Sequence, residues 1–138
     1  SITARAISIT AATDSRAYDG TTASSGTPTL TGGTLASGDS AVYSQVFANK
    51  NVGTSKTIIP SAVITDSGSN NVNANYAINL VNNTTGEITA RAITITAVTS
   101  TKVYDGTTSS TGIPVLGPGT IAAGETAVYS QTFDSRTV

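Results

Sequence analysis

The sequence contains no histidine, cysteine, methionine or tryptophan. The lack of histidine and cysteine excludes imidazole bases, thiol nucleophiles, disulfides and the usual ligands of zinc. Charged residues are only 11% of the chain, the net charge is -1, and the charges are scattered singly. We therefore expect no nucleic-acid partner. No apolar run is long enough for a transmembrane helix, so we expect no membrane insertion either.

Hydroxyl side chains take the place of the missing charges. Counting along the chain gives 26 Thr and 17 Ser. Threonine is β-branched, which suits an exposed pleated sheet better than a helix. This composition predicts an all-β protein.

An internal repeat organises the chain. A shift of 86 residues aligns Ile2-Thr-Ala-Arg-Ala-Ile7 with Ile88-Thr-Ala-Arg-Ala-Ile93, and 30 of the 52 overlapping positions are identical without a gap. Two copies of one module are therefore present. The second copy reaches only the counterpart of Val52, and the chain starts with neither Met nor a signal peptide, so we expect it to be part of something longer.

Alternating apolar residues predict the strands. Ile7 and Ile9 share one face of a strand over residues 6–10, and residues 41–47 are predicted as a strand although they also fit a helical face. Residues 57–65 are apolar but contain Pro60, which indicates an edge strand, a bulged strand or two short strands. Tyr76, Ile78 and Leu80 alternate as well.

Turn residues separate these strands. Asp19-Gly20 is a hairpin signal, and Gly32-Gly33 predicts a second tight turn. Residues 82–86, Asn-Asn-Thr-Thr-Gly, predict a turn that closes the module with a hairpin. About seven short strands per module favour tandem small, Ig-like β-sandwich modules, with a β-grasp-like sheet as the alternative.

The apolar parity slips by one residue around Ala90-Arg91-Ala92, which predicts a junction with almost no linker. We therefore divide the chain into residues 1–5, the end of a preceding repeat or a linker; residues 6–91, a complete repeat; and residues 92–138, the N-terminal part of a second repeat. So short a linker favours a rod.

The module resembles the YDG-type repeat domains of large bacterial haemagglutinin-like adhesins. The matching residues are Ile2-Thr-Ala-Arg-Ala-Ile7, Tyr18-Asp-Gly-Thr-Thr22, Ser37-Gly-Asp39, Phe47-Ala-Asn-Lys-Asn-Val-Gly53 with Lys56, and Asn75-Tyr76. The resemblance implies a repeated extracellular module, at the bacterial cell surface or secreted, with no catalytic residues to carry over. Ser40 departs from the pattern, because many relatives have a second acidic residue there.

The recurring Tyr-Asp pairs are the candidate ligand-binding residues: Tyr18, Asp19, Tyr104 and Asp105. The alternative is that the tyrosine packs and the Asp-Gly pair makes the turn. Residues 66–71 faintly resemble a calcium loop but lack its further carboxylates, so we expect no metal and no cofactor, with Ca²⁺ as the alternative. Eight scattered acids single out no catalytic pair, and we expect no enzymatic activity.

We therefore expect a structural stalk or spacer repeat that projects a distal binding region and has neighbouring repeats of the same polypeptide as partners. One alternative is a module that binds host or matrix glycans or proteins. Another is a strand-complemented filament subunit, which self-associates through the open edge of the second, shorter repeat.

Overall fold

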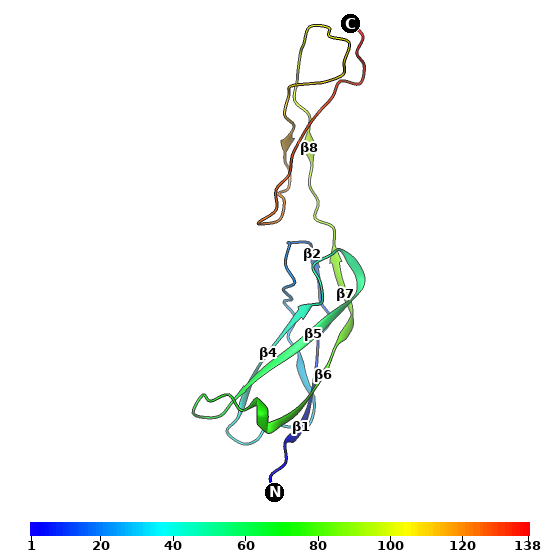
Figure 1. The fold of residues 1–138 in the computed structure, drawn as a ribbon. Helices are drawn as coiled ribbons and strands as arrows, with labels where there is room; N and C mark the ends of the chain where they lie inside the picture. Colours follow the sequence, from blue (N-terminus) through cyan, green and yellow to red (C-terminus); the bar gives the residue numbers. More distant parts are fainter. The chain divides into compact units, whose positions relative to one another are not determined.

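The computed structural model describes all residues, 1–138, and divides the chain into two compact units, Ser1–Ala90 (unit 1) and Arg91–Val138 (unit 2). Unit 1 contains seven strands and a 3-10 turn (Figure 1): β1 Arg5–Thr10, β2 Ser15–Ala17, β3 Thr29–Gly32, β4 Ser40–Phe47, β5 Gly53–Thr65, η1 Asn73–Asn75, β6 Tyr76–Val81 and β7 Asn83–Thr89. Unit 2 contains β8 Ile95–Thr96 and β9 Val115–Leu116. The predicted all-β class is confirmed. No helix is long and apolar enough to cross a membrane.

Unit 1 is a small β-sandwich. One sheet has the strand order β3-β1-β6 and the other has the order β2-β7-β5-β4. A first buried cluster joins the two sheets through Ile7, Ile9, Ile64 and Tyr76. A second cluster, at the other end of the core, consists of Ala11, Phe47, Ile58 and Ile88.

The predicted alternation of β1 and β4 is confirmed. Ile7 and Ile9 are buried while their neighbours are not, and β4 points Gln45 and Phe47 inward with Val42 outward. β5 runs unbroken through Pro60, which pairs with Gln45 of β4. The proline is tolerated because the pairing of β5 with β7 ends at Ile58, and β5 is bulged just before that point.

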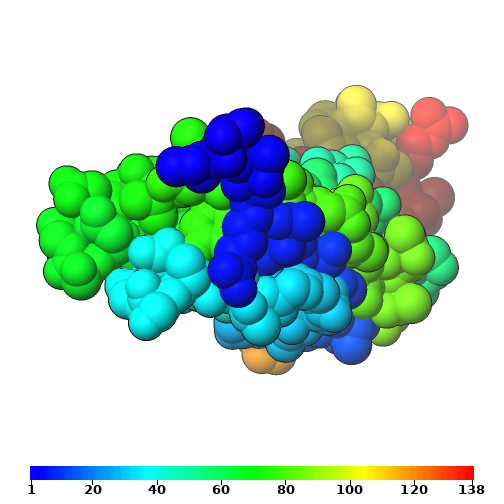
Figure 2. Space-filling model, turned by 90° about the horizontal axis from the view of Figure 1, so that it is seen from below, coloured from blue at the N-terminus to red at the C-terminus, as the bar shows by residue number.

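The first and last segments of unit 1 lie side by side and run in the same direction. We call residues 5–18 the entry segment and residues 76–89 the exit segment. β1 pairs parallel with β6, and β2 pairs parallel with β7. The chain therefore enters unit 1 at one end of the sandwich and leaves it at the other (Figure 1). Seen from below, the blue N-terminal residues lie exposed on the surface (Figure 2).

The predicted closing hairpin is wrong. Only Asn82 separates β6 from β7, and residues 83–86 belong to β7 rather than to a turn. The two strands lie in different sheets, because both follow the entry segment, which itself passes from one sheet to the other. Gly86 has a packing role in this extended segment rather than a role in a turn. A Cβ added at this position would stand 2.9 Å from the Phe47 ring.

The hairpin predicted at Asp19-Gly20 is also wrong, although the turn itself exists. Gly20 has a φ of 83°, but β2, which precedes it, pairs with β7 rather than with the next strand. The turn predicted at Gly32-Gly33 is present after β3. Gly33 has a φ of 74°, and a Cβ there would lie 2.4 Å from the carbonyl oxygen of Ala6, so no other residue fits without strain.

Unit 2 repeats side-chain contacts of the first half of unit 1, although of its strands only short counterparts of β1 and β3 are formed. Arg91 bonds to Thr120 just as Arg5 bonds to Thr34, through Nε to the carbonyl oxygen and a terminal nitrogen to the hydroxyl. Its apolar residues are more exposed, however. Ile95 is 49% exposed, whereas its counterpart Ile9 is fully buried.

This difference predicts unequal effects of one substitution. Ile9→Ala should lower the free energy of unfolding of unit 1 by about 2–5 kcal/mol, because it empties a buried site. Ile95→Ala should change the stability of unit 2 by about 0.5 kcal/mol or less. Urea denaturation followed by amide hydrogen exchange reports the two units separately. Equal effects of the two substitutions would contradict the burial described above.

Candidate functional site

The Tyr18-Asp19-Gly20 turn closes on itself. The Tyr18 amide donates to the Thr89 carbonyl at 2.8 Å, and its side chain packs against the second buried cluster. One Asp19 carboxylate oxygen accepts hydrogen bonds from the amide and the hydroxyl of Thr21, both at 2.8 Å. It also forms an ion pair with Arg16.

These contacts hold the Asp19 carboxylate in its charged form. The hydrogen bond from the Arg16 side chain, with those from Thr21, lowers the pKa of Asp19 to about 2. The Arg16 guanidinium in turn lies over the Phe47 ring, 5.3 Å from its centre, within cation–π range. The turn, the arginine and the core phenylalanine therefore form one connected structure.

Unit 2 builds the same turn with a different cation. Lys102 pairs with Asp105 at 2.9 Å and lies 5.6 Å from the centre of the Phe133 ring. Thr107 donates to Asp105 through its amide and hydroxyl, both at 2.9 Å. The hydrogen bond from the Lys102 side chain, with those from Thr107, lowers the pKa of Asp105 to about 2. The exchange of Arg16 for Lys102 thus preserves the role of the cation.

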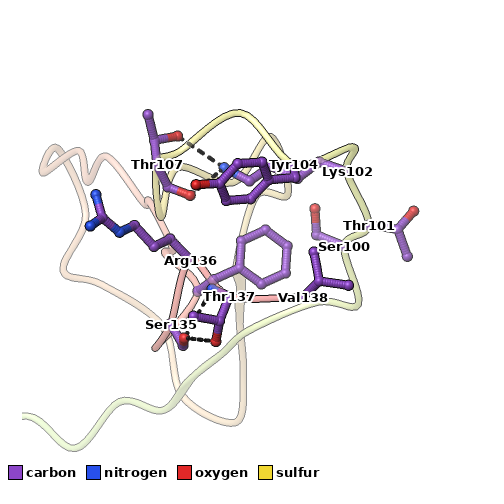
Figure 3. Close-up of a pocket in the computed structure, with 10 residues that line it drawn as sticks. Ser100, Thr101, Lys102, Tyr104, Thr107, Ser135, Arg136, Thr137 and Val138 are labelled. Carbon is purple, nitrogen blue, oxygen red and sulfur yellow. Dashed lines mark hydrogen bonds between the residues drawn. The ribbon is translucent and has the colours of Figure 1, made fainter.

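The two predicted tyrosines differ in their surroundings. Tyr18 is half-buried, whereas Tyr104 is 62% exposed. Tyr104 lines an open cavity of about 300 Å³ in unit 2, with Lys102, Thr107 and Arg136 also on its wall (Figure 3). The structure thus brings each predicted pair together within its own unit, Tyr18 with Asp19 and Tyr104 with Asp105, and their prediction as ligand-binding residues stays a prediction.

The loop predicted as a faint calcium site folds around its own carboxylate. One oxygen of Asp66 accepts from the amides of Gly68 at 2.8 Å and Asn70 at 3.0 Å, and the Asn70 side chain donates to both oxygens. The backbone hydrogen bond from Asn70 is the main cause that lowers the pKa of Asp66. These bonds give the Asp-Ser-Gly-Ser-Asn sequence a structural use.

Gln45 is a central residue that sequence reasoning did not single out. Its buried amide accepts from the Ala12 amide at 2.8 Å and donates to the Ala12 carbonyl at 3.1 Å and to the Ser24 hydroxyl at 2.9 Å. It thereby fastens the middle of the entry segment to β4. A Cβ on Gly26 would lie 2.3 Å from the Gln45 nitrogen, so that position needs glycine.

Unit 2 repeats this arrangement. Gln131 bonds to both backbone groups of Val98, at 2.9 Å each, and to Ser110 at 3.0 Å, beside Gly112. The recurrence of the glutamine, serine and glycine at a spacing of 86 residues is the signal that could have found them. We call the bonds from Gln45 to Ala12 and Ser24 the glutamine brace of unit 1. The equivalent bonds from Gln131 to Val98 and Ser110 are the glutamine brace of unit 2.

Two further matching motifs also have structural uses. The buried Tyr76 donates its hydroxyl to Asp39 at 2.6 Å and accepts from the Ala36 amide at 2.9 Å. The hydrogen bond to Asp39 raises the pKa of Tyr76. Between β4 and β5, the Asn49 side-chain oxygen accepts from the Asn51 amide at 3.1 Å and from Lys56 Nζ at 2.7 Å.

Unit 1 is thus a small β-sandwich repeat module. The polar residues of its recurring or matching motifs, such as Asp19, Asn49 and Tyr76, bond mainly to other residues of those motifs. The sequence profile of the YDG domain matches residues 3–86, more than half of the chain, and the chain belongs to this family. The YDG identity expected from the sequence is thereby confirmed. Comparison with curated proteins and with solved structures gives no match.

The charged turn makes a prediction about acid stability. The pKa of Asp19 in the folded chain, about 2, lies below its ordinary value of 3.8, so its stabilisation is complete above pH 3.8 and disappears as the pH falls through about 2. Asp19→Asn should lower the melting temperature of unit 1 at pH 7 and flatten its decline between pH 4 and 2.

Thermal unfolding followed by circular dichroism across this pH range provides the measurement. Val42→Thr, at an exposed position of unit 1, changes no titratable group; it is the control and should leave the pH profile unchanged. A profile for Asp19→Asn as steep as that of the unsubstituted chain would contradict the assignment.

Proposed function

We propose that the chain is a structural stalk or spacer repeat of an extracellular bacterial adhesin, which holds a distal binding region away from the cell. The observation that carries this proposal is the path of the chain through unit 1. The entry segment begins at one end of the sandwich and the exit segment finishes at the other. At roughly 3.3 Å per residue, the twelve steps from Arg5 to Ala17 extend about 40 Å.

A module with this path adds its own length to a tandem array, whereas a module with both ends together would not. The surface supports the same function. Hydroxyl pairs such as Ser44–Ser61, 2.7 Å apart, and Thr10–Thr31, 2.7 Å apart, join neighbouring strands on the outside. These pairs give the exposed side chains hydrogen-bond partners on the neighbouring strand, without charges that would attract another molecule.

The residues that mark the family support the spacer over a binding module. Asp19 and Tyr76 use their polar atoms within unit 1. A carboxylate already bonded to three groups is a poorer site for a glycan hydroxyl than a free one, because those bonds would have to be exchanged.

Glycan and matrix-protein arrays probed with the purified chain test the proposal. We expect no binding above that of an unrelated β-sandwich control. Reproducible binding that Tyr18→Ala or Asp105→Asn removes without lowering the melting temperature would replace the spacer by a binding module.

A second candidate, self-association through unit 2, has one specific observation in its favour. Ile93 and Ile95 are 43% and 49% exposed, whereas the equivalent Ile7 and Ile9 are covered in unit 1 by β6 and by Ile64 of β5. An exposed apolar strand with an unpaired edge can accept a strand from another chain. A filament would then grow by strand addition.

Size-exclusion chromatography with light scattering, at increasing protein concentration, tests whether the chain self-associates. Self-association through this face requires Ile95→Asp to restore the monomer. Val128→Asp should leave the oligomer intact, because Val128 and its counterpart Val42 both point outward, 98% and 73% exposed. A chain that stays monomeric at high concentration excludes the second candidate.

A further inference from the structure

The two ends of unit 1 are carried by neighbouring strands. The entry and exit segments are paired over nine residue positions, six between β1 and β6 and three between β2 and β7. Backbone hydrogen bonds bridge the interval between the two stretches, from Ala11 to Val81 at 2.9 Å and from Glu87 to Asp14 at 3.0 Å. The bond from Tyr18 to Thr89 follows at 2.8 Å. The two segments therefore form one nearly continuous parallel pair.

Tension along the chain loads this pair in shear. A pull on the N-terminus draws the entry segment backwards from Arg5, and a pull beyond Ala90 draws the exit segment forwards from Thr89. Because the segments are parallel, these forces slide one past the other along the strand direction, across the evenly spaced, slanted hydrogen bonds between them. All the bonds are then loaded together, whereas peeling from one end would break them singly.

Side chains oppose the sliding. Ile9 of the entry segment and Ile88 of the exit segment are fully buried, at 0% and 1% exposure. A shift of one residue would turn each of them to the opposite face of its sheet. Sliding therefore has to break the core and the hydrogen bonds in the same step.

The glutamine brace adds two further hydrogen bonds at the centre of the entry segment. Gln45 holds both backbone groups of Ala12 from β4, and β4 pairs with β5 over eight positions. Force on the entry segment is thereby shared with a strand that lies outside the parallel pair.

We propose that unit 1 is a shear clamp, a module whose parallel terminal segments resist mechanical tension along the stalk. The inference rests on the proposed stalk function for its biological use, but the mechanical property belongs to the fold itself. Unit 2 is a contrast within the chain, since its strand pairing consists of β8 with β9 and a single bridge.

Single-molecule force spectroscopy with two attachment geometries tests the clamp. The sequence has no cysteine, so introduced pairs give unique handles. Thr3→Cys with Ala90→Cys loads the parallel pair in shear, and Thr3→Cys with Ala74→Cys pulls its two starting ends apart. All three positions are exposed. At equal loading rate we expect a several-fold higher unfolding force in shear, followed by a gain of about 300 Å of unfolded chain before the folded length is subtracted.

The melting temperatures of the two double variants should agree, so that a force difference reports geometry rather than stability. Adding Gln45→Met should lower the shear force, whereas Val42→Thr, on the exposed face of the same strand, should not. If a double variant fails to fold, Ser1→Cys with Val138→Cys loads unit 1 in shear through unit 2.

Equal unfolding forces in the two geometries would overturn the shear clamp. That result would leave the array experiment untouched, so a spacer that bears no load remains distinguishable. Conversely, glycan or matrix-protein binding together with a high shear force would remove the spacer proposal and keep the clamp.

Discussion

The buried amide of Gln45 is the interaction on which the sandwich depends. It sits where the entry segment leaves the first sheet at β1 and joins the second at β2, a place where Ala12 has no strand neighbour for its amide and carbonyl groups. An unpaired buried peptide group costs about 1–3 kcal/mol. One glutamine satisfies both groups of Ala12, and the crossing between the two sheets becomes possible without an unsatisfied backbone.

The other recurrent features follow from this crossing. Because the entry segment serves both sheets, the exit segment that pairs with it must also pass from one sheet to the other, and it does so at Asn82. Gly26 leaves room for the glutamine amide. Unit 2 retains the brace through Gln131, Ser110 and Gly112, and the residue that it holds can change from Ala12 to Val98 because only backbone atoms are bonded.

Much of the local structure could be predicted from the sequence, whereas the connections could not. The alternation of Ile7 and Ile9 identifies a strand because strand periodicity is a local property. The hairpin expected after β6 was wrong because turn residues such as Asn83 and Gly86 show where a chain can bend, not where it must. The repeat drew attention to Asp19 and Asp105, but Gln45 looked like one more residue of a strand face, since its backbone partner lies 33 positions away and leaves no trace in side-chain identity.

The parallel pair of terminal segments links the folding of a module to its mechanical behaviour. Arg5 and Tyr76, the first partners of this pair, are 71 residues apart in the sequence, so the pair can form only when the whole module is present. Such non-local pairing slows folding, but it also places the paired segments between the two points where the chain enters and leaves unit 1. A repeat whose terminal segments pair only when the whole module is present can resist tension only once it is folded, and that pair then lies between the two points of load.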